Sequence, residues 1–150
     1  MAILGDGVKF AYSTGSPVSW TELTGLVDFP TPPAPVADKL EKTTHGTNGY
    51  KSYGLGLRDV PDIAATFHFD ASDAGQMAMI AARTAGTELW FRVEVPTNEA
   101  ATLFIAWEWK GYVNKADVTT PINGWQMLNL GIMYSDSYTF FDTPYASEID

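Results

Sequence analysis

The sequence predicts a mainly β fold of the α+β type: a β-sandwich or barrel of about seven or eight short strands, one flanking α-helix and a long inter-strand loop. Three observations support this. Apolar and polar residues alternate in several short segments, turns containing Gly or Pro separate them, and a single segment at about residues 73–85 has helical spacing. The 150 residues fit one domain, 1–150, around a single core.

The N-terminal part is expected to form short strands joined by turns. The segment VKFAYSTGSPVSWTEL predicts two strands around a Gly-Ser-Pro turn. The following DFPTPPAPVADKLEKTT carries Pro30, Pro32, Pro33 and Pro35. Because proline donates no backbone hydrogen bond, this segment indicates an extended stretch or a sheet edge. After Pro35 the chain is expected to pair as a strand through about Thr44.

A long glycine-rich loop is expected at about residues 43–59. Four glycines, at positions 46, 49, 54 and 56, mark it, and Asn48-Gly49 suits a tight hairpin turn. The apolar and aromatic side chains interleaved with these glycines are Tyr50, Tyr53, Leu55 and Leu57. A loop that only faces solvent rarely carries such side chains, so we expect it to bury them against a partner.

The segment SDAGQMAMIAARTAG predicts one amphipathic helix that packs on the sheet. Ser72 is expected to cap its N-terminus, with Asp73 in the first turn. Arg83 suits the last turn and Gly86 the terminating position. The face expected to pack inward carries residues at helical spacing, which are Met77, Ile80, Ala81 and Thr84.

The strands around this helix show alternation. IAATFHFD precedes it, and LWFRVEVP, TLFIAWEWKGYV and GWQMLNLGIMY follow, with SYTFF as a last short strand that closes the sheet. In LWFRVEVP, Trp90, Arg92 and Glu94 are expected to face outward. The inward set is Ala65, Phe67, Phe69, Leu89, Phe91, Val93, Val95, Leu103, Ile105, Trp107, Trp109, Val113, Leu128, Leu130, Ile132 and Tyr134.

The charge of the chain argues against a nucleic-acid-binding protein. The formal net charge is −9, and Lys and Arg form no cluster that would hold phosphates. The C-terminal segment 136–150 contains four acidic residues and no basic one, which indicates a solvated tail or a repelling surface. There is no apolar run long enough to span a membrane, so no membrane segment is expected.

No pattern in the sequence predicts catalysis, a cofactor or a metal site. His68 and Asp70 share one face of a strand, but this spacing is common in solvated strands. Glu94 and Glu108 sit in two successive strands, as a glycosidase pair would. Their neighbours Arg92 and Lys110 favour cross-strand ion pairs instead. We therefore expect no enzyme activity, no cofactor and no catalytic or metal-binding residue.

The order of these elements resembles the major tail tube protein of long-tailed bacteriophages (siphovirus type). The resemblance covers nearly the whole chain. It is carried by the proline-marked stretch DFPTPPAPVADKLEKTT, the loop 45–59, the passage YGLGLRDVPDIAATFHFD followed at once by a helix, and the late strand TPINGWQMLNLGIMYSD. Related β-sandwiches occur in tail-terminator and secretion-tube proteins.

This resemblance implies a structural virion protein that forms hexameric rings, which stack into a hollow tube through which viral DNA passes unbound. It implies copies of itself, a tape measure protein and tail-tip or terminator proteins as partners, with host cytoplasm as the location before assembly. The residues expected to contact a neighbouring subunit are His45, Asn48, Tyr50, Lys51, Tyr53, Leu55, Leu57 and Arg58. The acidic residues expected to face the lumen are Asp38, Glu41, Asp62, Asp70 and Asp117.

Three alternatives to a tube subunit remain open from the sequence. A small hydrolase would need His68, Asp70 or another acid to converge in a cleft. A carbohydrate-binding β-sandwich module would use Trp20, Trp90 or Trp125 as exposed stacking platforms for sugars. A tail-terminator or decoration-type virion protein would share the same class of sandwich.

Overall fold

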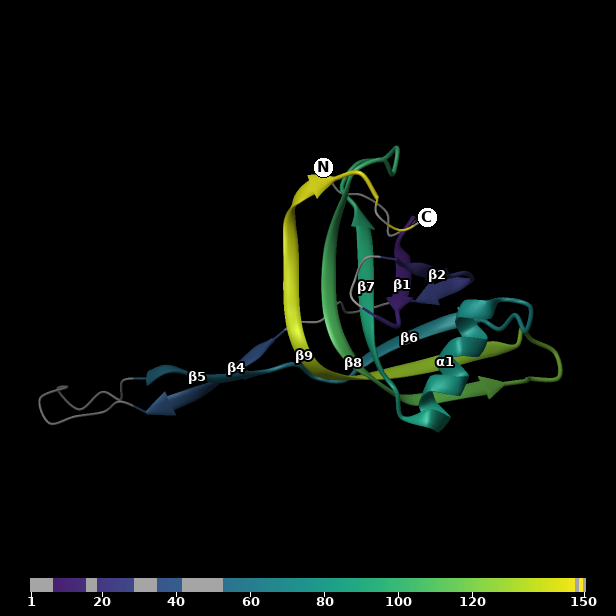
Figure 1. Ribbon diagram of the computed structural model, residues 1–150, viewed down its shortest axis with the longest axis horizontal. Helices are drawn as coiled ribbons and strands as arrows, with labels where there is room; N and C mark the ends of the chain where they lie inside the picture. The colour runs from purple at the N-terminus through teal and green to yellow at the C-terminus, as the bar shows by residue number, and fades with distance from the viewer. Residues whose placement is uncertain (1–6, 16–18, 29–34, 42–52, 148, 150) are drawn as a thin grey trace, which may run out of the picture.

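The computed structural model describes residues 7–15, 19–28, 35–41, 53–147 and 149. In this part of the chain there are nine strands and one helix, and all strand pairs are antiparallel (Figure 1). In chain order they are β1 (Lys9–Ser13), β2 (Thr21–Leu23), β3 (Leu26–Asp28), β4 (Val36–Glu41), β5 (Tyr53–Asp59), β6 (Ile63–His68), α1 (Ala74–Ala85), β7 (Glu88–Pro96), β8 (Phe104–Thr119) and β9 (Met127–Tyr145).

Seven strands form one sheet in the order β2-β1-β7-β8-β9-β6-β3, and β4 and β5 form a separate two-stranded sheet. The end strands β2 and β3 are consecutive in the chain, separated only by Thr24 and Gly25, so the large sheet almost closes on itself. Gly25 has φ 80°, and a Cβ there would lie 3.0 Å from the carbonyl oxygen of His68. This corner therefore needs glycine. The predicted mainly β fold with a flanking helix is confirmed.

The large sheet is folded into two layers because β8 and β9 bend together (Figure 1). The first layer contains β2, β1, β7, residues 104–113 of β8 and residues 132–145 of β9. The second contains residues 115–119 of β8, residues 127–131 of β9, β6 and β3. Gly111 lies at the bend, where a Cβ would overlap the carbonyl oxygen of Met133. A side chain at this position would push the two long strands apart.

The core lies between the two layers and the helix. Phe10 of the first layer meets Phe67 of the second edge-to-face at 5.8 Å, and Phe91 stacks on Trp109 at 5.7 Å between ring centroids. All four rings are fully buried, and Met79 of α1 packs into the same cluster. Burying large aromatic side chains supplies most of the apolar area that holds such a core together.

The extent of the helix was predicted correctly, but its N-cap was not. Asp73, and not Ser72, is the N-cap, because its Oδ1 accepts from the backbone N–H of Gly75 at 3.1 Å. The other carboxylate oxygen of Asp73 accepts from both the N–H and the hydroxyl of Thr24, which ties the helix to the corner after β2. Gly86 ends the helix in the left-handed conformation, with φ 69°.

The predicted inward face of the helix was largely wrong: Ile80 packs against the core, but Met77, Ala81 and Thr84 are exposed. Met77 is 42% exposed, and the residues buried on the core side are Gly75, Gln76, Met79 and Ala82. Gln76 is fully buried because its amide donates to the carbonyl oxygens of Thr24 (2.8 Å) and His68 (2.9 Å) and accepts from the N–H of Asp70 (2.9 Å). A polar residue thus occupies the face that a hydrophobic pattern assigns to solvent.

Three further details of the strands differ from the sequence-based expectation. SYTFF is not a separate strand but part of the 19-residue β9, in which Ser137 has φ 61° and the register with β8 shifts. Leu103 is 42% exposed and precedes β8. Arg92 and Glu94, expected to face outward, are 2% and 0% exposed. They lie on the face of the first layer that points away from the core, where the C-terminal segment and aromatic side chains cover them.

Candidate functional site

The sheet of β4 and β5, which we call the arm (residues 36–41 and 53–59), extends away from the two layers (Figure 1). Its two strands pair with each other and with no other described strand. Four of its apolar side chains are exposed: Val36 (58%), Leu40 (55%), Leu55 (76%) and Leu57 (87%). An isolated two-stranded hairpin is marginally stable in water. The arm therefore has the composition of a segment that needs a surface to pack on.

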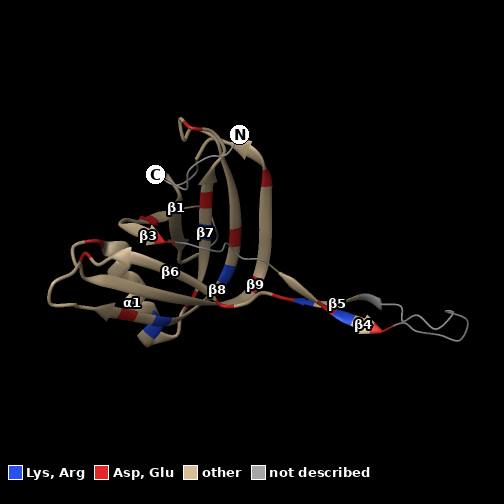
Figure 2. Cartoon of the chain, turned by 180° about the vertical axis from the view of Figure 1, so that it is seen from behind, with Lys and Arg blue, Asp and Glu red and all other residues tan. Residues whose placement is uncertain are grey.

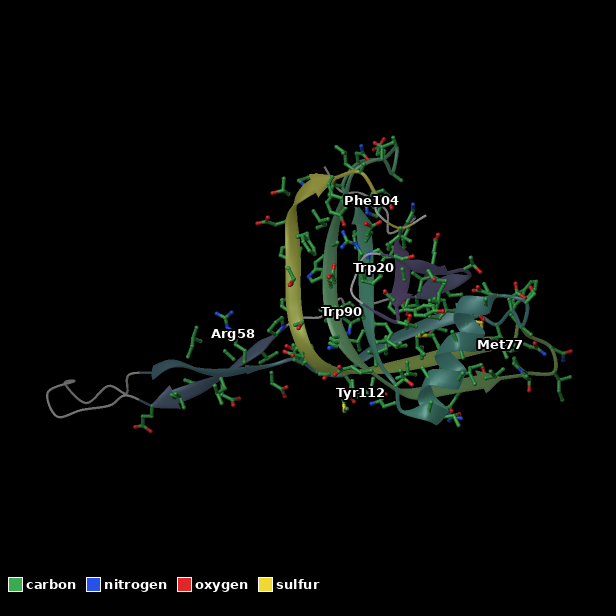
Figure 3. The ribbon with its side chains drawn as sticks, viewed as in Figure 1. Trp20, Arg58, Met77, Trp90, Phe104 and Tyr112 are labelled. Carbon is green, nitrogen blue, oxygen red and sulfur yellow. The ribbon has the colours of Figure 1, made fainter. Side chains whose placement is uncertain are left out.

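The eight residues expected to contact a neighbouring subunit fall into three groups. Leu55, Leu57 and Arg58 lie on β5 with exposed side chains, and Figure 3 shows Arg58 on the arm, away from the two layers. Tyr53 begins β5. The remaining four, His45, Asn48, Tyr50 and Lys51, lie outside the described residues. Val36 and Leu40 were not among the predicted contact residues, because charged neighbours interrupt the alternation of apolar residues in β4.

A second feature is an open edge on β9. Within β9, the residues that pair with β6 are 127–132, whereas β8 pairs with β9 from Met127 to Tyr145. Residues 133–145, which we call the β9 edge, thus have no described strand on their outer side. Their exposed apolar side chains include Met133 (43%), Phe140 (44%) and Phe141 (37%). Unpaired edges that carry apolar side chains are templates for strand addition by another chain.

A buried ion network lies on the outward face of the first layer. The Arg92 guanidinium contacts Glu108 Oε2 at 2.7 Å and Glu94 Oε2 at 3.3 Å, and it also binds the Tyr145 hydroxyl. That hydroxyl donates to Glu94 Oε2 at 2.9 Å. The pKa of Tyr145 is raised above its ordinary value, mainly by burial of the hydroxyl and next by its hydrogen bond with Glu94. Both glutamates are thus partners of Arg92, as the ion-pair interpretation predicted.

Aromatic rings cover this network. Arg92 lies over the rings of Phe141, Tyr145 and Trp20 at 5.0, 5.2 and 5.7 Å from the guanidinium carbon to the centroids. Cation–π contacts of this kind are strongest where water is excluded. The network therefore holds the second half of β9 against β7 and β8, and thereby fixes the position of the β9 edge.

Glu88, at the start of β7, is a half-buried carboxylate that accepts hydrogen bonds from side chains of two neighbouring strands. The hydrogen bonds from Ser135 and Lys110 lower the pKa of Glu88 below 4.5, and the Lys110 ammonium lies 3.0 Å from its Oε1. Ser135 belongs to β9 and Lys110 to β8. These contacts join three neighbouring strands close to the bend.

The two residues considered as an acid–base pair are engaged in local structure. Asp70 accepts from the N–H of Ser72 at 2.9 Å and from its hydroxyl, and these hydrogen bonds lower the pKa of Asp70 below 3.8. His68 lies edge-to-face with Trp125 at 5.7 Å. His68 and Asp70, together with Trp125 and Gln126, line an open cavity of about 580 Å³. No group of three or more potential metal ligands occurs among the residues described.

The three tryptophans considered as sugar platforms do not form a shared surface. Trp20 and Trp90 are partly buried, and each carries a cation over its ring: Arg92 over Trp20 and Lys110 over Trp90, the latter at 5.6 Å. Trp125, 77% exposed, belongs instead to the loop between β8 and β9. A flat aromatic platform of the kind that stacks on sugars is not built by these three side chains.

Acidic positions are spread over the body and the arm (Figure 2). The five acidic residues expected to face a lumen lie on different elements. Asp38 and Glu41 are on the arm, and Asp62 follows it, 3.3 Å from the side-chain amide of Asn114. Asp117 is on β8, 3.9 Å from both Arg83 and Lys115. Asp70 lies between β6 and α1. Within one chain these carboxylates do not form a single cluster.

Among the described residues, no helix has the length and apolar character needed to cross a membrane.

Comparison with known proteins places this fold among phage-tail-like structures. No family model and no curated protein matches the sequence. Among solved structures, the tail of an empty gene transfer agent particle with C6 symmetry is similar at TM-score 0.72 and 16% identity, over 93% of this chain and 98% of that one.

Two further solved structures share the fold. The SPP1 tail tube is similar at TM-score 0.64 and 16% identity, over 99% of this chain and 81% of that one. The six-fold symmetrised baseplate of the anti-feeding prophage gives TM-score 0.68 at 7% identity, over 89% and 91%. The chain has the fold of these tail proteins.

Proposed function

We propose that this chain is the structural subunit of a tail tube, which assembles with copies of itself into rings that stack into a hollow tube. The fold is that of subunits from tails and tail-like particles, two of which were solved with six-fold symmetry. This supports six copies per ring. The role is structural and not catalytic, and the full chain 1–150 acts as one tube domain.

The exposed arm is the main observation that supports this proposal. A ribbon with four exposed apolar side chains extends from the body, and its two strands pair with each other and with no other strand in the described part of the chain. Such a ribbon gains stability when another copy covers it, and a head-to-tail contact of this kind closes into a ring when its rotation permits. The arm contacts to a neighbour would use Leu55, Leu57 and Arg58, together with the predicted positions at His45, Asn48, Tyr50, Lys51 and Tyr53.

The charge of the chain suits a channel for DNA. Carboxylates repel phosphate, so a lumen lined with them lets DNA pass without binding. Candidates for this lining are Asp38, Glu41, Asp62, Asp70 and Asp117. Tubes built from a variant with Asp62→Lys and Asp117→Lys are expected to retain DNA in a salt-dependent manner, whereas wild-type tubes release it. If neither the variant tubes nor the wild-type tubes retain DNA, Asp62 and Asp117 do not face the lumen.

Within a virion, a tail tube meets a tape measure protein in its lumen and tail-tip and terminator proteins at its ends, and we propose these as partners. The protein would reside in the virion tail, and in the host cytoplasm before assembly. The net charge of −9 supports solubility of the free subunit at the concentrations that assembly requires.

Substitution of the arm leucines tests the proposal. Concentrated wild-type protein is expected to form rings or tubes of uniform width by negative-stain microscopy and to sediment faster as its concentration rises. The double variant Leu55→Ser/Leu57→Ser should remain monomeric, because each leucine buried in an interface contributes about 1.5–3 kcal/mol. Its circular dichroism should match the wild type, since both side chains are exposed.

Met77→Ser is the matched control, because this exposed apolar side chain lies on α1 and not on the arm. It should assemble like the wild type. Normal tubes from the leucine variant would refute the role of the arm. A wild-type protein that stays monomeric at every concentration would refute the tube itself.

A further inference from the structure

The chain that follows β9 crosses the first layer to reach β1. In the sheet order, β8 and β7 separate β9 from β1. Lys9 of β1 nevertheless binds both Ser147 and Ile149, and Figure 1 shows the C-terminal end of the chain close to β1. Tyr145, Ser147 and Ile149, which we call the C-terminal strap, therefore lie across the outward face of the first layer.

Hydrogen bonds to a buried carboxylate hold the strap in place. The hydroxyls of Ser147 and Tyr145 donate to the two carboxylate oxygens of Glu94, at 2.5 and 2.9 Å. The Lys9 ammonium donates to the carbonyl oxygen of Ile149 at 3.3 Å. Glu94 is 0% exposed and Ile149 is 1% exposed. Because a buried carboxylate has lost its hydration, it depends on such donors, and the strap and Glu94 stabilise each other.

The second half of β9 has few other buried contacts. Among the described strands it pairs with β8 alone, and its register with β8 shifts at three places. Every residue from 135 to 144 except Tyr138 is exposed. Phe140 stacks on Trp107 in the middle of this half, and the strap attaches its end. Segments with few buried contacts open locally at a lower free-energy cost than the whole domain. The strap is therefore a main attachment of this half to the body.

We propose that the C-terminal strap is a conformational switch for assembly. With the strap closed on the first layer, the second half of β9 lies against β8 and the β9 edge is available to another copy. With the strap open, this half detaches from β8 and the subunit presents no continuous edge. The inference rests on the proposed self-assembly and adds its regulation, and it holds for any element of the neighbour that meets the edge.

The size of the effect follows from the contacts of the strap. Loss of a buried hydrogen bond to a charged group changes such an equilibrium about tenfold, and loss of a buried Ile side chain changes it by a similar factor. Removing one of each should shift the opening equilibrium about a hundredfold. In a two-state switch with about 1–10% of the open form, this shift lowers the closed fraction about two- to tenfold. The affinity of assembly falls by the same factor, because only closed subunits assemble.

The full-length double variant Ser147→Ala/Ile149→Ser tests the switch. In dilute, monomeric protein, hydrogen exchange read by mass spectrometry should be about tenfold faster or more at residues 133–145, whereas β6 and α1 should exchange as slowly as in the wild type. At higher concentration, sedimentation and negative-stain microscopy should find a critical concentration for tube formation about two- to tenfold above that of the wild type. Ser147→Thr, which keeps the hydroxyl, should stay close to the wild type in both measurements.

Ala146→Ser is the matched control, because Ala146 is exposed between Tyr145 and Ser147 and the added hydroxyl removes none of the strap contacts. It should match the wild type in both measurements. If exchange at residues 133–145 is unchanged in the double variant, or if β6 and α1 open with it, the strap is no separate switch and the inference is wrong while the tube proposal stands. Faster exchange with an unchanged critical concentration would overturn the inference in the same way. If wild-type protein forms no assembly at all, the tube proposal itself fails.

Discussion

Replacing Gln76 with leucine is expected to destabilise the monomer strongly, although leucine has about the same size and suits a buried helix position. The Gln76 amide is fully buried and makes three hydrogen bonds to backbone groups, at Thr24, His68 and Asp70. These three groups belong to the corner that brings the two ends of the large sheet together. The substitution leaves all three backbone groups without their hydrogen-bond partner, because a leucine side chain neither donates nor accepts a hydrogen bond.

The magnitude follows from the number of bonds. A hydrogen bond contributes about 1 kcal/mol net, and a buried group left without a partner costs about 1–3 kcal/mol. Because part of the corner can rehydrate, we expect a loss of about 3–5 kcal/mol in the free energy of unfolding. That is a large share of the roughly 5–15 kcal/mol that holds a typical domain folded.

Urea unfolding of the monomer, followed by tryptophan fluorescence, measures this loss as a lower midpoint at unchanged slope. Gln126→Leu is the matched control, because Gln126 is exposed and takes part in none of the three hydrogen bonds made by the Gln76 side chain. The control should stay within about 0.5 kcal/mol of the wild type. If Gln76→Leu costs less than about 1 kcal/mol, the amide does not hold the corner and the reasoning is wrong.

Three more substitutions probe other parts of the fold. Arg92→Met leaves two buried glutamates without their cation and should cost about 3–5 kcal/mol in thermal unfolding, whereas also changing both glutamates to glutamine should recover part of the loss. Gly111→Ala should lower the melting temperature, because the new methyl group overlaps the Met133 carbonyl at the bend; an unchanged melting temperature would show that the bend adjusts without cost. For Glu88, the lowered pKa means that its contribution to stability is present above about pH 4.5 and is lost as the pH falls through the folded-state pKa. Wild type should therefore exceed Glu88→Gln in urea midpoint at pH 7 but not at pH 2.5, and a constant difference would contradict this.

Local signals predicted much of the fold. Helical spacing and Gly86 located α1 within one residue at each end, and alternation placed Ala65 and Phe67 in the core. These signals are local because a helix end or a strand face depends on neighbouring residues. The glycines interleaved with apolar side chains, in contrast, predicted a long loop over about residues 43–59, whereas residues 53–59 form the strand β5 and residues 43–52 lie outside the described residues.

What the sequence did not show depends on contacts between distant segments. The buried face of α1 was misassigned because Gln76 finds its partners in β6 and near Thr24, far away in the sequence. Arg92 alternates like an exposed residue, and only the aromatic rings of Trp20 and of the second half of β9 make it buried. No local pattern contains such information.

The candidate site was predictable only in part for the same reason. The arm was expected from its composition, whereas the β9 edge exists because β6 pairs with β9 no further than Ile132. That stopping point is a property of the sheet register and not of the residues from 133 onward. The acidic residues chosen as lumen candidates were selected from their strand positions, and the structure distributes them over the arm, the turn after it, the second layer and the segment between β6 and α1.

The continuity of β9 has a mechanical consequence. One strand of nineteen residues runs from the second layer through the bend and along the whole height of the first. A pull along this strand loads its hydrogen bonds to β8 and β6 in shear, so many must break together, whereas a perpendicular pull would open them one after another. Tension that enters at one end of β9 is thus shared by both halves of the molecule, which resists stretching in that direction better than peeling.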